Sequence, residues 1–302
     1  IALNMYIRNL FLLIFLSFFT FNSFSISTVS DTSKINKTRI YIVSGSLISS
    51  VTASYFYIEK VWWSEQSRDF HFDKGNDMVY AQNVDKAGHF MGGLLASETF
   101  SSSFLWAGLS EEKSVWYGAL YGSALQLAIE IKDAYAPHWG FSKWDLIIGS
   151  AGSFLPVLKH YSKTANAFNI KMSYYPHSNI YWELENQRDN FPSKFDWHDD
   201  YPNQTYWISA DVNHFIQQDW WPDFLNIAVG FGIDDTQYLT QGNTKLGGEN
   251  EFYIALDYDI PKLLKNWNSD RGKKVKKWLN FIKLPAPTIR ISPTVEFYPF
   301  FM

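Results

Sequence analysis

The sequence predicts an α+β fold in which a bundle of about four helices precedes an antiparallel β-rich half. Two patterns indicate this division: helix-length segments rich in Ala, Gly, Ser and Leu occupy residues 38–165, and apolar residues alternate with other residues in the region 166–302. Hydrophobic residues make up 46% of the 302 residues, and aromatic residues 19%. This composition can form a substantial core, which excludes a wholly disordered chain.

The N-terminal segment has the pattern of a secretory signal. One cation, Arg8, precedes an apolar run from Leu10 to Phe21, and small residues occupy positions 23 and 25. The run is shorter than the roughly 20 residues that span a bilayer. We therefore interpret residues 5–25 as a cleaved signal peptide, the alternative being an uncleaved anchor. Residues 26–37 are predicted to form a flexible lead, and the mature protein is expected outside the cytoplasm.

Four helices are predicted in residues 38–165, which we interpret as a membrane-associated core. Small residues recur three or four positions apart within them, as at Gly118 and Gly122 or at Gly149 and Gly152. This spacing lets helix backbones approach closely, either in lipid or in a tightly packed bundle outside it. The predicted helices are Arg39–Trp63, Lys86–Leu109, Glu111–Tyr135 and Lys143–Tyr161.

Alternation with a period of two follows the helices. Residues 251–259 alternate between an apolar row, Phe252, Ile254 and Leu256, and a mixed row, and the segment Thr288–Phe300 behaves in the same way. A period of two predicts half-exposed, antiparallel strands, of which we expect about six. Two arrangements stay open: a small sheet packed beside the bundle, or a strand assembly in the outer membrane with the helices as its plug.

A basic segment, residues 262–283, interrupts the strands. It contains eight Lys or Arg residues and one acid, in a chain whose net charge is −4. Cations interleaved with Trp and Leu are typical of a segment lying on an anionic membrane face; the alternative is a solvated loop or helix. Because the whole chain is mildly acidic, nucleic acid is not an expected partner. The predicted membrane-surface residues are Lys273, Lys274, Lys276, Lys277 and Trp278.

Four polar residues are predicted to meet at one end of the bundle. His89 lies near the start of the second predicted helix, Glu130 and Asp133 lie near the end of the third, and Asp145 opens the fourth. If these helices are antiparallel neighbours, the four side chains converge. An imidazole with two or three carboxylates can bind a divalent cation or perform acid–base catalysis, so all four are candidate metal ligands, and all except Asp133 are candidate catalytic residues. Nearby loops add two further candidate ligands, His71 and His138.

The same residues have structural interpretations. Asp85 can cap a helix that begins at Lys86, and Ser142 with Asp145 resembles a capping box. Glu130 can pair with a cation between two helices. A structural polar network is therefore the competing interpretation of this cluster.

Several chemical classes are excluded by what the 302 residues lack. They contain no cysteine, no phosphate-binding Gly-rich loop, no G-x-S-x-G and no H-E-x-x-H motif. A disulfide framework, a thiolate zinc site and a cysteine nucleophile are therefore excluded. No familiar catalytic motif assigns an activity.

The order of the polar residues resembles a known family. Asp85-Lys86-x-x-His89-Phe90 is followed by Glu130-x-x-Asp133, then by Gly140-Phe141-Ser142-x-x-Asp145 and by Gly152. This pattern, over residues 85–155, is similar to that of the YfiM-like family of predicted periplasmic lipoproteins of unknown function and, more distantly, to the helical core of VanZ-like membrane proteins. The resemblance implies a bacterial envelope protein with a polar cluster in its helical core, and no established activity. It makes motif residues of Asp85, Lys86, Ser142 and Gly152.

Two departures from these families matter. YfiM-like proteins are expected to carry a lipid-bearing cysteine, and because the 302 residues contain none, we expect no N-terminal lipidation. VanZ-like proteins tend to have Asn four residues after the Asp that matches Asp145, where this chain has Gly149. If that Asn supports a site, its absence weakens the case for the same site here.

We therefore expect an exported protein of the bacterial cell envelope, periplasmic or membrane-associated. Its role is predicted to be structural or partner-binding, with membrane lipids or another envelope protein as the partner and a His/carboxylate network in the helical core. The alternative is a metal-dependent hydrolase acting on a lipid- or cell-wall-linked substrate, in which a divalent metal held by His89, Glu130, Asp133 and Asp145 activates water.

Overall fold

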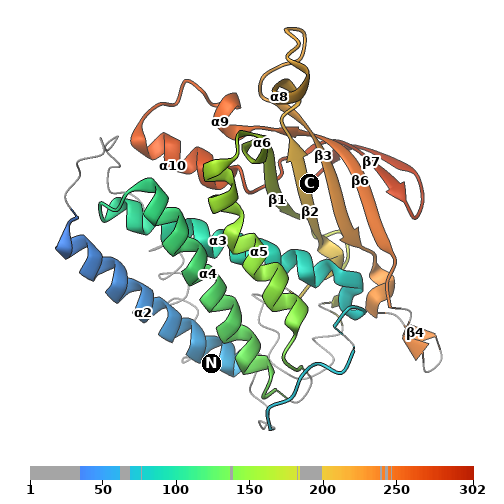
Figure 1. Ribbon diagram of the computed structural model, residues 1–302. Helices are drawn as coiled ribbons and strands as arrows, with labels where there is room; N and C mark the ends of the chain where they lie inside the picture. The colour runs from blue at the N-terminus through green and yellow to red at the C-terminus, as the bar shows by residue number, and fades with distance from the viewer. Residues whose placement is uncertain are drawn as a thin grey trace, which may run out of the picture.

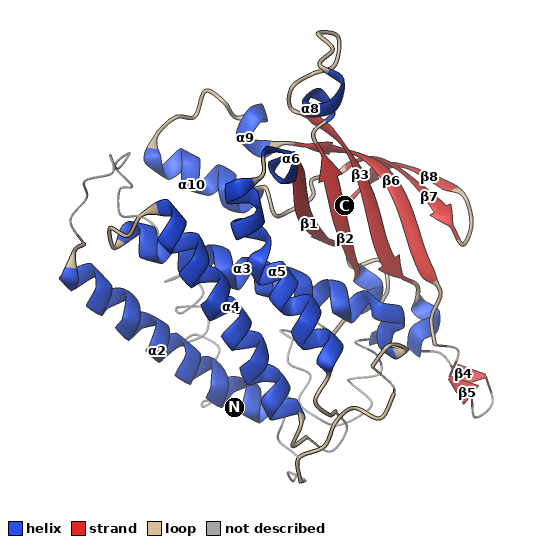
Figure 2. Ribbon diagram, in the orientation of Figure 1, coloured by secondary structure: helices blue, strands red, loops and turns tan. Residues whose placement is uncertain are grey.

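The computed structural model describes residues 35–61, 69–75, 77–136, 139–181, 183, 199–238, 240–241, 244–245 and 247–302. The predicted signal peptide, most of the predicted lead and His138 lie outside these residues. Within them, the helices lie side by side on one flank of the molecule and a curved sheet forms the other (Figure 1, Figure 2). The prediction of an α+β fold with the bundle before the sheet is confirmed.

The described residues of the helical half form four long helices: α2 (Lys37–Val61), α3 (Val84–Trp106), α4 (Glu111–Asp133) and α5 (Lys143–Tyr161). The helices α3, α4 and α5 pack against one another, and α2 lies against α3, where Val43 meets Phe100 and Phe104. Each helix matches its predicted range to within a few residues. In the described part of the chain, we find no helix whose length and hydropathy would suffice for a bilayer span.

The starts of α5 and α3 differ from each other in how they are capped. The Ser142 hydroxyl accepts a hydrogen bond from the N–H of Asp145 at the start of α5, as the capping pattern predicts. The predicted role of Asp85 as an N-cap is wrong, because α3 already begins at Val84 and Asp85 lies within its first turn. The Asp85 carboxylate pairs instead with Lys86, 2.9 Å away.

Small residues allow the inner helices to touch through their backbones. A Cβ on Gly152 would lie 2.0 Å from the carbonyl oxygen of Phe90, and one on Gly93 would lie 2.0 Å from that of Gly149. Because no larger side chain fits at such contacts, α3 and α5 approach backbone to backbone. This short separation helps to bring side chains from the three inner helices to a common point.

The second half forms a six-stranded antiparallel sheet in the order β1-β2-β3-β6-β7-β8. The row Thr288–Phe300, predicted as one strand, forms two, because Pro293 lies between them and cannot donate to a strand ladder. The strands are β1 (Phe168–Tyr174), β2 (Gln204–Ala210), β3 (Leu225–Ile233), β6 (Asn250–Tyr258), β7 (Ala286–Ser292) and β8 (Glu296–Phe301), with a separate pair β4 (Thr240–Gln241) and β5 (Thr244–Lys245). The short helix α6 (Lys163–Asn166) joins α5 to β1, and three further short helices connect strands, namely α8 (Val212–Ile216), α9 (Ile260–Leu263) and α10 (Asp270–Leu279).

The two faces of this sheet differ sharply in polarity. One, named here the charged face, carries every Lys, Arg, Asp and Glu of the six described strands: Lys171, Glu251, Asp257, Arg290 and Glu296. The other, named the apolar face, carries the cross-strand row Ile208, Val229, Ile254, Ile289 and Phe297. Most of the charged face is buried, whereas this apolar row is exposed. This is the reverse of the usual half-buried sheet.

The curvature of the sheet encloses the charged face. The segment after α10 runs beside the outer edge of β1, where the backbone N–H of Lys283 donates to the carbonyl oxygen of Met172. The Lys283 ammonium donates to the carbonyl oxygen of Phe301 at the end of β8, 3.3 Å away. The two edges of the sheet thus approach each other, and Trp207, Tyr253 and Phe301 pack together on the enclosed face.

One corner of the apolar face packs on the helical half. Val84, Met91 and Leu94 of α3 form a buried cluster with Tyr206 of β2 and Ile233 of β3. The exposed cross-strand row lies outside this cluster. The helices therefore cover only part of the apolar face.

Candidate metal centre

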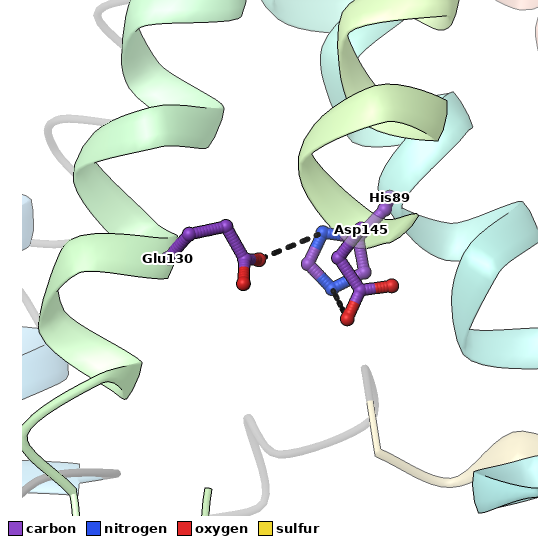
Figure 3. A group of neighbouring side chains, drawn as sticks. All are labelled: His89, Glu130 and Asp145. Carbon is purple, nitrogen blue, oxygen red and sulfur yellow. Dashed lines mark ion pairs between the residues drawn. The ribbon is translucent and has the colours of Figure 1, made fainter. Parts of the chain in front are cut away.

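Three polar side chains converge where α3, α4 and α5 meet. His89 comes from α3, Glu130 from the last turn of α4 and Asp145 from the first turn of α5. One ligand atom from each lies within 4.8 Å of the other two, and Figure 3 shows the imidazole between the two carboxylates. The structure thus brings together three of the four residues that the helix pattern predicts to meet.

His89 is held in a defined orientation. Its Nδ1 lies 3.1 Å from the amide oxygen Oε1 of Gln126 and 4.0 Å from Oε1 of Glu130, while its Nε2 lies 3.9 Å from Oδ2 of Asp145. Because an amide oxygen only accepts, Gln126 favours the tautomer in which Nδ1 carries the proton and Nε2 has a free lone pair. The His89 side chain is 24% exposed, more than either carboxylate.

A buried lysine balances part of the negative charge. The Lys86 ammonium lies 2.9 Å from Asp85, 2.8 Å from Asp145 and 2.5 Å from Asp77, which belongs to the segment before α3. Asp145 uses Oδ1 for this ion pair, so its Oδ2 is the oxygen that faces His89. Burial alone would lower the pKa of Lys86, but the carboxylates around it raise that pKa above its usual value, and the lysine stays cationic.

Negative charge exceeds positive charge in this cluster. The described residues place four largely buried carboxylates, Asp77, Asp85, Glu130 and Asp145, beside one lysine and one imidazole. Burial, opposed by the N–H of Ser142 and reinforced by the charge of Asp145, raises the pKa of Glu130 to about 8. Burial also raises the pKa of Asp85 to about 6. Without a ligand, burial and the neighbouring carboxylates thus favour the protonated form of Glu130.

Glu130 has one carboxylate oxygen engaged and one available. Its Oε2 accepts a hydrogen bond from the backbone N–H of Ser142 at 2.9 Å, whereas its Oε1 is buried and has no hydrogen-bond partner among the described residues. A buried carboxylate oxygen without a partner is unfavourable. Since Oε1 also faces His89, it marks the point where a proton or a cation is needed.

The other predicted residues of this region lie around the centre. Asp133, one turn after Glu130, is outside the converging group, although its charge still raises the pKa of Glu130. Ser142 caps α5 and also donates through its hydroxyl to Asp77 at 2.8 Å. Gly152 lies at the contact between α3 and α5. These residues position the site from outside the group of three.

His71, one of the two further candidate ligands, lies outside the group of His89, Glu130 and Asp145. Its Nε2 is 2.7 Å from the carbonyl oxygen of Trp139 and its Nδ1 is 3.1 Å from that of Asp69. Both ring nitrogens therefore meet backbone groups rather than the centre. Asp77, in contrast, was missed by the sequence analysis, because it precedes α3 and no helical spacing links it to the other acids.

Gln126 was missed as well, and its side chain packs against Gly149. A Cβ on Gly149 would lie 2.7 Å from the side-chain amide of Gln126, so the absent side chain leaves the room that this amide occupies. The sequence did indicate the position of Gln126, since Gln126 precedes Glu130 by four residues and therefore shares its helical face.

The predicted membrane-surface residues of the basic segment have different environments. Lys276 is buried and donates to the carbonyl oxygen of Leu264, so its predicted place on the surface is wrong: it lies on the inner side of α10. Lys277 is exposed but pairs with Glu98 of α3. The others are exposed or half-buried, namely Lys273, Lys274 and Trp278.

Residues 72–161 match the family model described as "Predicted periplasmic lipoprotein (DUF2279)". The match covers α3, α4 and α5, and so it contains the whole His89, Glu130 and Asp145 group. The resemblance to predicted periplasmic lipoproteins is confirmed over this range, which is less than half of the chain, while the more distant VanZ-like resemblance stays a prediction. No curated protein and no solved structure gave a significant match.

Proposed function

We propose that this chain is an exported protein of the bacterial envelope whose helical half binds a divalent cation between His89, Glu130 and Asp145. The observation that carries the proposal is the convergence of ligand atoms from three helices within 4.8 Å. Export is supported by the signal peptide predicted at residues 5–25. It is supported also by the similarity of residues 72–161 to predicted periplasmic lipoproteins.

The geometry suits a small divalent cation. Three atoms within 4.8 Å of one another share a point about 2.8 Å from each, and shifts below about 1 Å would reach the ~2.0–2.2 Å of zinc bonds to nitrogen and oxygen. Zinc and manganese both accept imidazole and carboxylate ligands. His89 would bind through Nε2, with its Nδ1–H held by Gln126, which is the usual outer contact of a metal-bound histidine.

The competing interpretation is a structural network in which a proton on Glu130 takes the place of the cation. It agrees with the raised pKa of Glu130. It leaves Oε1 of Glu130 without an acceptor or donor among the described residues, and Lys86 can neutralise only one of the three carboxylates that it touches. A cation meets both needs, because it would coordinate Oε1 and offset the excess negative charge.

A hydrolase is the second candidate function, and the open side of the site favours it. Three protein ligands leave a fourth position for water, as in catalytic zinc sites. His89, the most exposed of the three ligands, marks the side from which water would enter. A divalent cation held there would lower the pKa of a bound water toward neutral, and the hydroxide left after loss of the proton could attack an ester or amide. Such bonds occur in lipid- and cell-wall-linked substrates.

Calorimetry on the metal-free full chain tests the cation site. We expect Zn²⁺ or Mn²⁺ to bind with one site per chain, and His89→Ala to weaken binding at least about tenfold, because one of three ligands is lost. The matched control is His71→Ala, which removes an imidazole that meets only backbone carbonyls. This control should bind the metal as the unaltered chain does.

Two results would contradict the cation site. One is the absence of binding by either metal; the other is binding that His89→Ala leaves unchanged while the variant keeps its helical circular dichroism. A further measurement separates the hydrolase from a purely binding role. Mass spectrometry of envelope lipids and cell-wall fragments incubated with the metal-loaded chain should show cleavage products that are missing with His89→Ala, and their absence would leave cation binding alone.

A further inference from the structure

We propose that the apolar face of the sheet is a docking surface for an anionic lipid bilayer. The loop around α8 and the basic α9–α10 segment, both at one end of the sheet, form the contact with the bilayer interface. This inference rests on the polarity of the sheet and does not depend on the cation site. A protein without the cation would still have this surface.

The apolar face is continuous across five strands. Ile208 pairs with Val229, Val229 with Ile254, Ile254 with Ile289, and Ile289 with Phe297. All five are exposed, by 42% at the least for Ile289 and 62% at the most for Phe297. Adjacent rows add exposed apolar side chains, at Ile227 and Phe252. Large contiguous apolar surfaces of this kind mark protein or membrane contacts.

The charged residues of the six described strands all lie on the opposite face and are paired there. Lys171 lies 2.7 Å from Asp257, both fully buried, and Arg290 pairs with Glu251 and Glu296. Strands that face lipid have this alternation, with apolar residues toward the lipid and polar residues away from it. The inversion of the sheet is therefore the expected one for contact with hydrocarbon.

The chemistry of the cross-strand row favours lipid over a protein partner. Protein interfaces carry about one hydrogen bond per 100–200 Å² and a polar rim. The side chains of Ile208, Val229, Ile254, Ile289 and Phe297 offer neither donor nor acceptor. A hydrocarbon environment requires no hydrogen-bond donor or acceptor from the side chains that face it.

The loop around α8 adds an aromatic tip at one end of the sheet. It connects β2 to β3, projects beyond the strands (Figure 1), and exposes Phe215, Ile216 and Trp220, the last by 72%. Tryptophan is enriched at the boundary between hydrocarbon and water, because its ring is apolar and its N–H is polar. This loop is placed to enter that boundary when the apolar face meets a bilayer.

Cations lie at the same end as the aromatic tip. In the register, the start of β3 pairs with the end of β6, so the α8 loop and the α9–α10 segment leave the sheet together. Lys262 of α9 joins the two segments through an ion pair with Asp211 at 2.6 Å. The segment exposes Lys265, Arg271 and Lys273. Cations beside an apolar surface fit anionic head groups, which selects an anionic bilayer as the occupant.

Co-sedimentation of the full chain with lipid vesicles tests the proposal. Vesicles of phosphatidylcholine mixed with phosphatidylglycerol should bind the chain more strongly than phosphatidylcholine alone, and added salt should weaken the difference. Val229→Glu places a charge at the centre of the cross-strand row and should reduce partitioning at least about tenfold, from the transfer cost of a charge. Trp220→Ala should reduce partitioning by a smaller factor.

The matched control is Leu120→Glu on α4, since Leu120 and Val229 are each 53% exposed. Because α4 also exposes apolar side chains, this control decides between the sheet and the bundle as the membrane surface. We expect Leu120→Glu to bind vesicles as the unaltered chain does. Thermal unfolding monitored by circular dichroism should show that both variants are folded.

Three outcomes would overturn the proposal. In the first, Val229→Glu binds vesicles as strongly as the unaltered chain does. In the second, Leu120→Glu abolishes vesicle binding, which would make the bundle the membrane surface. In the third outcome, the unaltered chain binds neither kind of vesicle. It sediments instead as a dimer, and the Val229→Glu substitution dissociates that dimer. The apolar face would then be a contact between two copies of the chain.

Discussion

Individual buried charges shape both halves of this protein. In the helical half, Lys86 lies among three carboxylates, and burial, reinforced by the negative charge of Asp145, raises the pKa of the nearby Glu130 to about 8. Around Asp257 in the sheet, the excess is positive: Lys171 pairs with Asp257 at 2.7 Å, and Lys283 is buried near both. The two imbalances have opposite signs and opposite consequences for the pH dependence of stability.

We expect Lys283 to make the free energy of unfolding depend on pH between about pH 8 and pH 10.5. Burial, reinforced by the charge of Lys171 and opposed by that of Asp257, lowers the pKa of Lys283 from 10.5 to about 8. Between these two values the unfolded chain keeps a proton that the folded chain has released, so the free energy of unfolding rises with pH there. One such lysine contributes a slope of at most about 1.4 kcal/mol per pH unit.

Urea unfolding at pH 8, 9 and 10 measures this slope. Lys283→Met should make the dependence on pH shallower than in the unaltered chain, because the methionine has no proton to release. Lys273→Met is the control, since Lys273 is exposed, and its slope should match that of the unaltered chain. Equal slopes for all three proteins would show that Lys283 is cationic in the folded state, and the prediction would be wrong.

At the scale of elements, glycine sets the separation of the inner helices. Gly152 of α5 lies against the backbone of Phe90 on α3, one residue after His89. The position of His89 relative to Asp145 therefore depends on this contact. The small residues noted in the sequence thus act on the candidate metal centre through helix packing rather than through chemistry.

Gly152→Ala should destabilise the protein. The new Cβ would lie 2.0 Å from a carbonyl oxygen, so the helices must separate, and overpacking of this kind costs about 1–3 kcal/mol. Gly45→Ala in α2 is the control, because its Cβ would meet nothing within 4 Å and should stabilise the helix by about 0.5–1 kcal/mol. Chemical unfolding followed by far-ultraviolet circular dichroism gives both values, and a neutral effect of Gly152→Ala would contradict the close packing.

At the scale of the whole molecule, one cluster joins the two halves. Met91 and Leu94 of α3 are buried against Tyr206 and Ile233 of the sheet. This junction covers one corner of the apolar face and ties the helix that carries His89 to β2 and β3. The two halves should therefore unfold together.

Met91→Ala tests this coupling. Removing a buried methionine side chain should cost about 2–5 kcal/mol, and the loss should appear equally in circular dichroism, which reports mainly on the helices, and in fluorescence of Trp207 and the other tryptophans. Met78→Ala is the control, because Met78 is 49% exposed and should change stability by less than about 0.5 kcal/mol. A shift in the helical signal alone would show that the halves unfold independently.

Much of this structure could be predicted from the sequence, because local periodicity determines local elements. The helices lie where Ala, Gly, Ser and Leu recur, the strands lie where residues alternate, and His89, Glu130 and Asp145 meet because they lie at ends that adjacent antiparallel helices bring together. The position of Gln126 beside the cluster was also predictable, because Gln126 precedes Glu130 by four residues on the same helix. Asp77 was not predictable, since it belongs to no periodic element.

Only the tertiary structure decided which face of the sheet is inside. A period of two divides a strand such as β6 into the rows Phe252–Ile254–Leu256 and Glu251–Tyr253–Ala255, and the alternation alone does not identify the buried row. The curvature of the sheet, completed where Lys283 reaches Phe301, encloses the mixed row and leaves the apolar one exposed. Burial depends on what closes over a surface, and that contact joins residues far apart in the chain.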